Sequence, residues 1–242
     1  MAERTRPADA SVRLAQRRRQ ALRKRLRRAF VAALVLVVVA GGVWVVGFSA
    51  ALAVTAVSVT GTSVLTAEQV TAAAQVPMGT PLVRLDVAAI EKRVALLKPV
   101  ASVQVTRSLP NKITIAVTER RAVYAVSAGS GFDLVDATGV PYTSVMDVPA
   151  GLLVANITGD SERLRRDVAT VATALPKVLR DRAVLVNAAS PDSIVIELRG
   201  GAEVVWGSAE NSEEKAGVIA ALLTISASVY DVSSPSHPTT KA

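Results

Sequence analysis

The residues with the clearest potential for covalent chemistry are Ser212 and Lys215, which lie three positions apart in the sequence Ser-Glu-Glu-Lys. A serine three residues before a lysine is the nucleophile pattern of penicillin-recognising enzymes, where a basic group takes the serine proton. The Lys-Thr-Gly and Ser-Asp-Asn sequences that accompany this pattern do not occur in the chain. A serine followed by two glutamates is also typical of a helix N-cap, and we favour that interpretation of Ser212.

Other kinds of catalytic chemistry have few residues to draw on. The 242 residues include no cysteine and one histidine, His237, which lies in a Ser/Pro-rich tail. This composition excludes disulfides, thiolate zinc sites and cysteine nucleophiles, and it leaves a Ser-His-Asp triad only His237. Gly129-Ser130-Gly131 lacks the flanks of a hydrolase nucleophile motif, and no glycine-rich loop precedes a Lys-Ser/Thr pair. We therefore predict no catalytic residues, no cofactor, no metal and no small-molecule substrate.

The positive charge of the chain is confined to its N-terminal segment. The formal net charge is +8, but residues 1–29 hold 11 Lys/Arg against Glu3 and Asp9, which gives +9. The remaining residues carry 17 basic and 18 acidic groups, a net charge of −1. A nucleic-acid-binding domain would place its positive patch on a folded face, so we do not expect a nucleic-acid partner.

A long apolar segment follows the basic one. No charged residue occurs from Ala29 to Ala67, and residues 30–51 are strongly apolar. This length suffices to cross a hydrocarbon core of roughly 30 Å at about 1.5 Å per residue. Trp44 and Phe48 lie near its far end, where aromatic rings suit the membrane interface. We predict a single transmembrane helix over residues 30–51.

The basic cluster sets the expected topology of this helix. It flanks one end only, so the positive-inside rule places residues 1–29 in the cytoplasm and the rest outside. Basic clusters beside a span also contact anionic lipid. A cleaved signal peptide ending near Ala51-Leu52-Ala53 is the alternative, but the apolar run exceeds the usual 7–15 residues.

The segment after the span predicts a small domain over residues 52–121. Thr66 to Gln69 is a capping-box pattern that begins a helix near Ala67, and Asp86 caps a second helix that Pro99 ends. Ile113, Ile115 and Val117 alternate as in a strand, after a turn containing Pro110 and Asn111. The expected order is strand, helix, helix, strand, strand.

This order after one span resembles a polypeptide-transport-associated (POTRA) domain, and several short sequence motifs resemble those of the FtsQ/DivIB family. In the first domain the resemblance rests on Val59-Thr60-Gly61, Pro99-Val100, the hairpin of Arg107, Pro110-Asn111 and Ile113 to Val117, and Glu119-Arg120-Arg121. Further along the chain it includes the turn Asp136-Ala137-Thr138-Gly139, Gly207 with Glu214-Lys215, and the terminal strand Val229 to Val232.

The next segment, residues 122–232, predicts a second, mainly antiparallel β domain with two helices. Asp136-Ala137-Thr138-Gly139 fits the turn of a hairpin, Ser161 begins one helix, and Glu213 and Glu214 favour the first turn of the other. Residues 233–242 form the Ser/Pro-rich tail. The predicted fold class is therefore α+β.

The family resemblance implies a membrane-anchored, non-enzymatic scaffold of the bacterial divisome. It implies a place at the septum, a link between early and late division proteins, and membrane partners of the FtsB and FtsL type. The alternative is an anchored cell-wall enzyme of the penicillin-recognising type that uses Ser212 and Lys215.

Two stretches are candidates for partner binding. Val229, Tyr230, Asp231 and Val232 form the last predicted strand, and we expect it at a sheet edge because only the tail follows it. The alternative for Tyr230 is a place in the core. Glu119, Arg120 and Arg121 are the secondary candidates, and a solvated cluster with ion pairs at the domain junction is the favoured interpretation of them.

Overall fold

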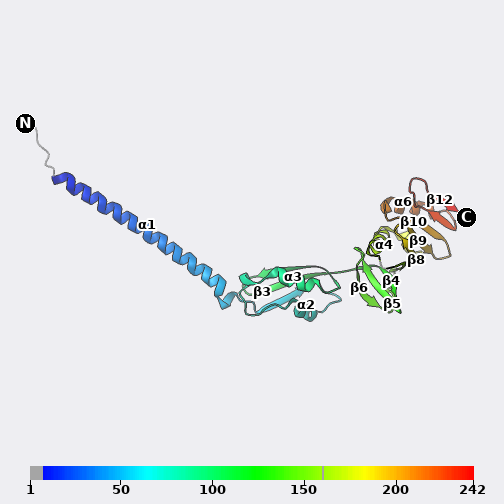
Figure 1. Ribbon diagram of the computed structural model, residues 1–242, viewed down its shortest axis with the longest axis horizontal. Helices are drawn as coiled ribbons and strands as arrows, with labels where there is room; N and C mark the ends of the chain where they lie inside the picture. Colours follow the sequence, from blue (N-terminus) through cyan, green and yellow to red (C-terminus); the bar gives the residue numbers. More distant parts are fainter. Residues whose placement is uncertain (1–7, 160) are drawn as a thin grey trace, which may run out of the picture. The chain divides into compact units, whose positions relative to one another are not determined.

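The computed structural model describes residues 8–159 and 161–242 and confirms an α+β fold with one N-terminal apolar helix. After that helix come a three-stranded sheet and a nine-stranded sheet, each with helices of its own (Figure 1). By internal contacts the chain divides into two compact units, one of residues 1–58, 75–90 and 105–115, the other of residues 59–74, 91–104 and 116–242.

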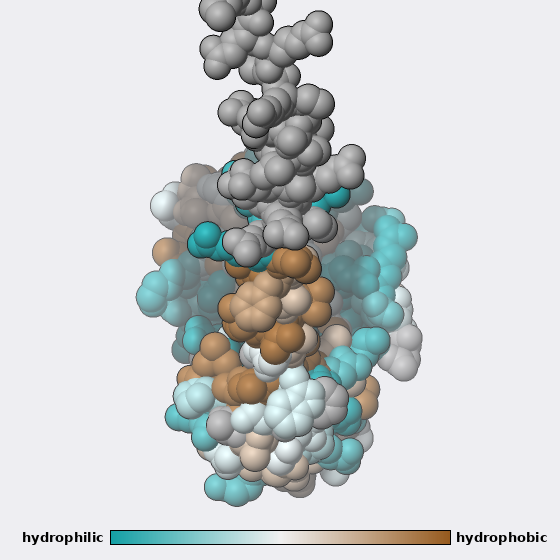
Figure 2. All heavy atoms as spheres, turned by 90° about the vertical axis from the view of Figure 1, so that its left-hand side faces the viewer, coloured by the Kyte–Doolittle hydropathy of each residue, from teal (hydrophilic) through white to brown (hydrophobic). Residues whose placement is uncertain are grey.

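The N-terminal helix, α1, spans Ala8–Phe48. Its segment Lys24–Val45 is long and apolar enough to cross a membrane, and the side chains of that segment are exposed (brown in Figure 2 where apolar). Residues 1–7 of the predicted cytoplasmic tail lie outside the described residues, and residues 8–29 belong to the same helix as the apolar segment.

The small domain has the predicted order of elements. Its sheet has the order β1-β3-β2, and the three residues between β2 and β3 make these two strands a hairpin. The elements are η1 (Ala50–Leu52), β1 (Ala56–Thr60), α2 (Ala67–Ala74), η2 (Leu82–Arg84), α3 (Val87–Ala95), β2 (Val100–Ser108) and β3 (Lys112–Glu119).

The local signals in the sequence explain these elements. Thr66 Oγ1 accepts from the Gln69 amide at 3.2 Å while Gln69 Oε1 accepts from the Thr66 amide at 2.9 Å, which is the predicted capping box. Asp86 Oδ1 accepts from the Ala89 amide at 3.0 Å. The alternating residues of β3, Ile113, Ile115 and Val117, are buried as predicted.

Gly61 is required by the turn after β1. Its φ is +83°, and an added Cβ would lie 2.0 Å from the Val117 carbonyl oxygen. A side chain there would meet both backbone strain and a backbone clash, so the turn depends on glycine.

The second domain is built on a nine-stranded sheet with the order β12-β11-β10-β9-β8-β7-β4-β5-β6. The β4–β7, β7–β8 and β10–β11 pairs are parallel and the others antiparallel, so the sheet is mainly antiparallel as predicted. Its elements are β4 (Ala122–Ala128), β5 (Gly131–Asp136), β6 (Pro141–Val145), β7 (Leu153–Ile157), α4 (Glu162–Ala174), α5 (Lys177–Arg180), β8 (Ala183–Ser190), β9 (Ser193–Leu198), β10 (Glu203–Gly207), α6 (Ser212–Leu222), β11 (Val229–Asp231) and β12 (Thr239–Lys241).

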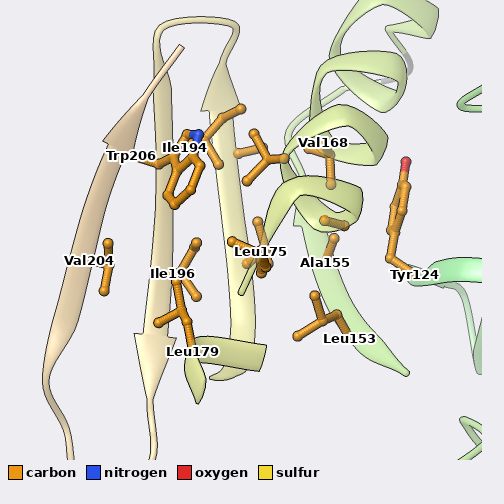
Figure 3. Packing of buried hydrophobic residues seen from close by; sticks show 14 of the residues in the cluster. Tyr124, Leu153, Ala155, Val168, Leu175, Leu179, Ile194, Ile196, Val204 and Trp206 are labelled. Carbon is orange, nitrogen blue, oxygen red and sulfur yellow. The ribbon is translucent and has the colours of Figure 1, made fainter. Parts of the chain in front are cut away.

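Helix α4 packs its apolar side on this sheet and provides much of the core (Figure 3). Ser161 Oγ accepts from the Leu164 amide at 3.3 Å, which confirms Ser161 as the N-cap of α4. The short α5, next along the chain, was not predicted, although its Leu179 is fully buried.

The end of the chain differs from the prediction in one respect that matters for function. We expected β11 to be an edge strand because only the tail follows it. Thr239–Lys241 instead forms β12, which pairs antiparallel with β11 and takes the edge position. The expectation that the tail leaves β11 uncovered is therefore wrong.

Candidate partner-binding site

Ser212 and Lys215 are buried, and both are held by neighbouring groups rather than by each other. The Ser212 hydroxyl donates to the Ala209 carbonyl at 2.8 Å and accepts from Trp206 Nε1 at 3.1 Å. Lys215 Nζ donates to the carbonyls of Trp206 at 3.0 Å and Ser208 at 2.8 Å. Burial lowers the pKa of Lys215, and the nearby charge of Glu210 opposes that change.

The N-cap prediction for Ser212 is wrong. Asn211 occupies the N-cap position with φ of +54°, and Ser212 is the first residue of α6. An open cavity of about 730 Å³ lies beside this helix start, with Ser212, Glu213 and Glu214 in its lining. The serine proton is donated to a main-chain oxygen, and so are two of the three N–H donors of Lys215. This pair therefore anchors α6 to the end of β10, and the serine proton is not directed at the lysine as in a nucleophile and its base.

Glu119 fixes the loop that precedes α2. Its carboxylate accepts from the Ser63 hydroxyl at 2.7 Å, from the Val64 amide at 2.9 Å and from the Leu65 amide at 2.8 Å. Burial alone would raise the pKa of Glu119, but these hydrogen bonds outweigh it and lower the pKa to about 2. The carboxylate is therefore ionised, and it accepts hydrogen bonds from groups of the same chain.

Arg120 is also engaged. Its guanidinium forms an ion pair with Asp136, and Nε donates to the Lys98 carbonyl at 3.2 Å. Asp136 Oδ1 accepts in addition from the Thr138 amide at 2.9 Å and the Val140 amide at 3.0 Å. Burial opposes ionisation of Asp136, but these hydrogen bonds hold its pKa below the usual range.

Arg121 differs from its two neighbours because its side chain is exposed. The structure thus divides the secondary candidates: Glu119 and Arg120 have structural roles, and Arg121 is the one whose exposure permits contact with a partner.

The primary candidates belong to β11 and the residue after it. Tyr230 is 2% exposed, its hydroxyl donates to the Ile225 carbonyl at 2.7 Å, and it accepts from the Ala227 amide at 3.1 Å. Val232 is fully buried, whereas Val229 and Asp231 are half-buried. The core position is thus the correct one for Tyr230, and its ring is not an exposed contact.

The exposed feature at this end of the sheet is β12. All three of its side chains, Thr239, Thr240 and Lys241, are exposed, and among the strands of the described residues β11 is its only neighbour in the sheet order. Two further bonds hold it, because the Ser228 amide and hydroxyl donate to the Lys241 carbonyl at 2.7 and 3.0 Å. The outer side of β12 is where a further strand can pair with main-chain groups.

Comparison with known proteins identifies the family. A family model described as the POTRA domain, FtsQ-type, matches residues 52–120. The cell division protein FtsQ of Streptomyces venezuelae is 42% identical to the chain over 217 residues, covering 84% of this chain and 80% of the relative. This chain belongs to the FtsQ family of cell division proteins.

Two further FtsQ proteins are similar to most of this chain. FtsQ of Streptomyces coelicolor is 42% identical over 232 residues, covering 88% of each chain. FtsQ of Mycolicibacterium smegmatis is 36% identical over 186 residues, covering 76% of this chain and 56% of the relative. The solved extracytoplasmic domain of the cell division protein DivIB from Geobacillus stearothermophilus is 14% identical, with a TM-score of 0.36, covering 44% of this chain and 93% of that chain.

The feature of this FtsQ chain that sequence reasoning missed is β12. Its residues, Thr-Thr-Lys, alternate no apolar side chains, so they give none of the usual signal for a strand. Two threonines next to one another were the single hint, since β-branched residues favour strands.

Proposed function

We propose that the protein is a non-enzymatic scaffold of the divisome at the septum, anchored by α1. In this proposal the N-terminus is cytoplasmic and both sheet domains lie outside the membrane. Lys24, Arg25, Arg27 and Arg28, which are exposed, contact anionic lipid at the inner face. The absence of charge from Ala29 to Ala67, beside this one-sided basic cluster, supports the topology.

The scaffold links early and late division proteins through contacts with membrane partners of the FtsB and FtsL type. The observation that carries this proposal is the edge at β12, whose short strand has exposed side chains and a free side. A segment of the FtsB-type partner adds to this edge as a further strand, with main-chain hydrogen bonds giving affinity and side chains giving specificity. Val229 to Val232 support the site from behind, and Arg121 is a secondary contact.

Removal of residues 233–242 tests this site. The deletion takes away β12 and leaves β11 paired with β10. We expect co-purification of the FtsB-type partner from cross-linked membranes to be lost while the membrane level of the protein is unchanged. Thr240→Ala is the matched control, because it keeps the main-chain groups of β12 and should keep the partner.

Two other outcomes would change the proposal. Undiminished capture by the deletion variant would place the contact elsewhere, with Arg121 the next position to test. Increased capture would mean that β12 shields β11, and that the partner pairs directly with Val229–Asp231. Labelling of the wild-type protein by a fluorescent penicillin, with loss of the label in Ser212→Ala, would contradict a scaffold without enzymatic activity.

A further inference from the structure

The connection between α1 and the first sheet is short and held by main-chain hydrogen bonds. The Ser49 amide donates to the Val45 carbonyl at 2.9 Å, and the amides of Leu52 and Ala53 donate three residues back, both at 3.2 Å. The 3-10 turn η1 therefore follows the helix directly. At about 2 Å per residue in such a turn, residues 49–53 advance the chain by only about 10 Å.

The end of α1 coincides with the length that a bilayer requires. Arg28 is the last charged residue before the apolar run, and a core of roughly 30 Å takes about 20 helical residues. Residues 29–48 supply that length, and α1 ends at Phe48. Residues 49–53 then lie at the depth of the lipid headgroups.

The chain enters the folded domain within that same short distance. The Val54 amide donates to the Thr80 carbonyl at 3.0 Å, and the Gly79 amide donates to the Val54 carbonyl at 2.9 Å. The Thr55 amide donates to the Asn111 carbonyl at 2.9 Å. Two loops are thereby tied to residues 54 and 55, the one before η2 and the turn between β2 and β3.

These two loops and the adjoining η2 expose large apolar side chains. Met78 is 56% exposed, Val83 56% and Leu109 77%. In the same segment Leu82 and Leu85 are buried, so the loop has core positions and Val83 is not one of them. Arg107 holds this arrangement, since its guanidinium donates to the carbonyls of Leu82 at 2.8 Å and Leu85 at 2.7 Å.

The charge of the same surface fits an anionic membrane. Residues 77–86 and 107–112 contain Arg84, Arg107 and Lys112 against a single acid, Asp86. Single exposed apolar residues are common on proteins and need no explanation by themselves. Here three of them lie beside positive charge, on segments that are tied to the residues following the proposed span. The membrane surface is therefore close to them.

We propose that Met78, Val83 and Leu109 form a membrane-docking tip that inserts into the headgroup region of the outer leaflet. Apolar side chains enter the boundary between headgroups and acyl chains, while Lys112 and its basic neighbours attract anionic lipid. The tip would restrain the first sheet at the membrane surface. This inference rests on the proposed span of α1.

The absence of cysteine permits a direct test with single nitroxide labels on the full chain. The variants Met78→Cys, Leu109→Cys, Leu96→Cys and Val35→Cys are labelled and reconstituted into nanodiscs of equal parts phosphatidylcholine and phosphatidylglycerol. Leu96 is the matched control because it is 82% exposed but precedes β2, whereas Leu109 follows it. The nine residues of β2 lie between them in the chain, and a strand of that length extends about 30 Å.

Collision rates with oxygen and with a water-soluble nickel complex then report depth. We expect labels at positions 78 and 109 to show an oxygen-to-nickel ratio several-fold above that at position 96. The ratio should fall toward the value at position 96 in the double variant Met78→Ser, Val83→Ser labelled at Leu109→Cys. In nanodiscs without phosphatidylglycerol the ratio at position 109 should decrease.

Equal ratios at positions 78, 96 and 109 would overturn the inference if the label at position 35 reports the acyl region. If position 35 is itself exposed to water, the span has failed and the proposed function fails with it. Protection of positions 78 and 109 only after division proteins are added would make the tip a protein contact and would also overturn the membrane proposal.

Discussion

The cluster at Glu119–Arg120 and the strand end at β12 use their polar groups in opposite ways. The carboxylate and guanidinium of the first look like a binding site in the sequence, yet they bond to Ser63, Leu65 and Asp136 within the chain. The second contains only Thr-Thr-Lys, yet it has a free edge. At Glu119 and Arg120, charged side chains fix the chain internally, whereas the exposed edge at β12 is defined by main-chain position.

Substitution of Tyr230 should have the largest effect on stability, since this buried residue lies in β11, next to the exposed edge strand β12. Tyr230→Ala should destabilise the domain by about 3–5 kcal/mol, because it removes a buried ring. It should therefore reduce partner capture by unfolding rather than by loss of contact. Thermal unfolding of the reconstituted full chain checks this, with Thr240→Ala as the control of unchanged stability. An unchanged midpoint in Tyr230→Ala would mean that the ring is not in the core.

Gly61→Ala tests the region fixed by Glu119, since the turn at Gly61 leads into the loop that the Glu119 carboxylate holds. The strained φ should cost about 1–3 kcal/mol, and the clash with the Val117 carbonyl adds to that loss. Gly79→Ala is a matched control, because its φ is also positive, at +78°, but an added Cβ meets nothing within 4 Å. Equal losses in urea unfolding of the two variants would contradict the clash.

Glu119→Gln should have a smaller effect that depends on pH. The pKa of Glu119 is about 2 in the folded protein, below its ordinary value of 4.5. Its stabilising contribution is therefore complete above pH 4.5 and is lost as the pH falls toward 2. At pH 7 the variant should be less stable by about 1 kcal/mol. Between pH 4.5 and 2 its unfolding midpoint should fall less steeply than that of the wild type, and a parallel fall would contradict the assignment.

Arg121→Ala should have the smallest effect on folding, below about 0.5 kcal/mol, because its side chain is exposed. Arg120→Ala is the comparison, since it leaves the Asp136 carboxylate, 8% exposed, without its cation. Thermal unfolding should separate the two variants clearly. Similar losses would show that Arg121 also has a structural role.

Local patterns made the small domain predictable from the sequence. The capping box at Thr66–Gln69 and the alternation of Ile113, Ile115 and Val117 each describe their own neighbourhood, and the structure has the corresponding helix and strand. The resemblance to the FtsQ/DivIB family, carried by such motifs, is confirmed by the relatives.

What the sequence did not reveal is which segments become neighbours. Alternation does not encode the partner of a strand, so the parallel pairs β4–β7, β7–β8 and β10–β11 could not be foreseen. The edge was misplaced for the same reason, since a three-residue polar strand has no periodicity of its own. Ser212 was misassigned because its buried partner, Trp206, comes from the preceding strand.

Amide hydrogen exchange of the membrane-reconstituted protein, with and without the FtsB-type partner, tests the central claim most directly. Strand addition engages main-chain amides, so Thr239 to Lys241 should become protected when the partner binds. The opposite edge of the same sheet, β6, should be unchanged. Protection at β6 or around Arg121, with β12 exchanging as in the free protein, would contradict the account.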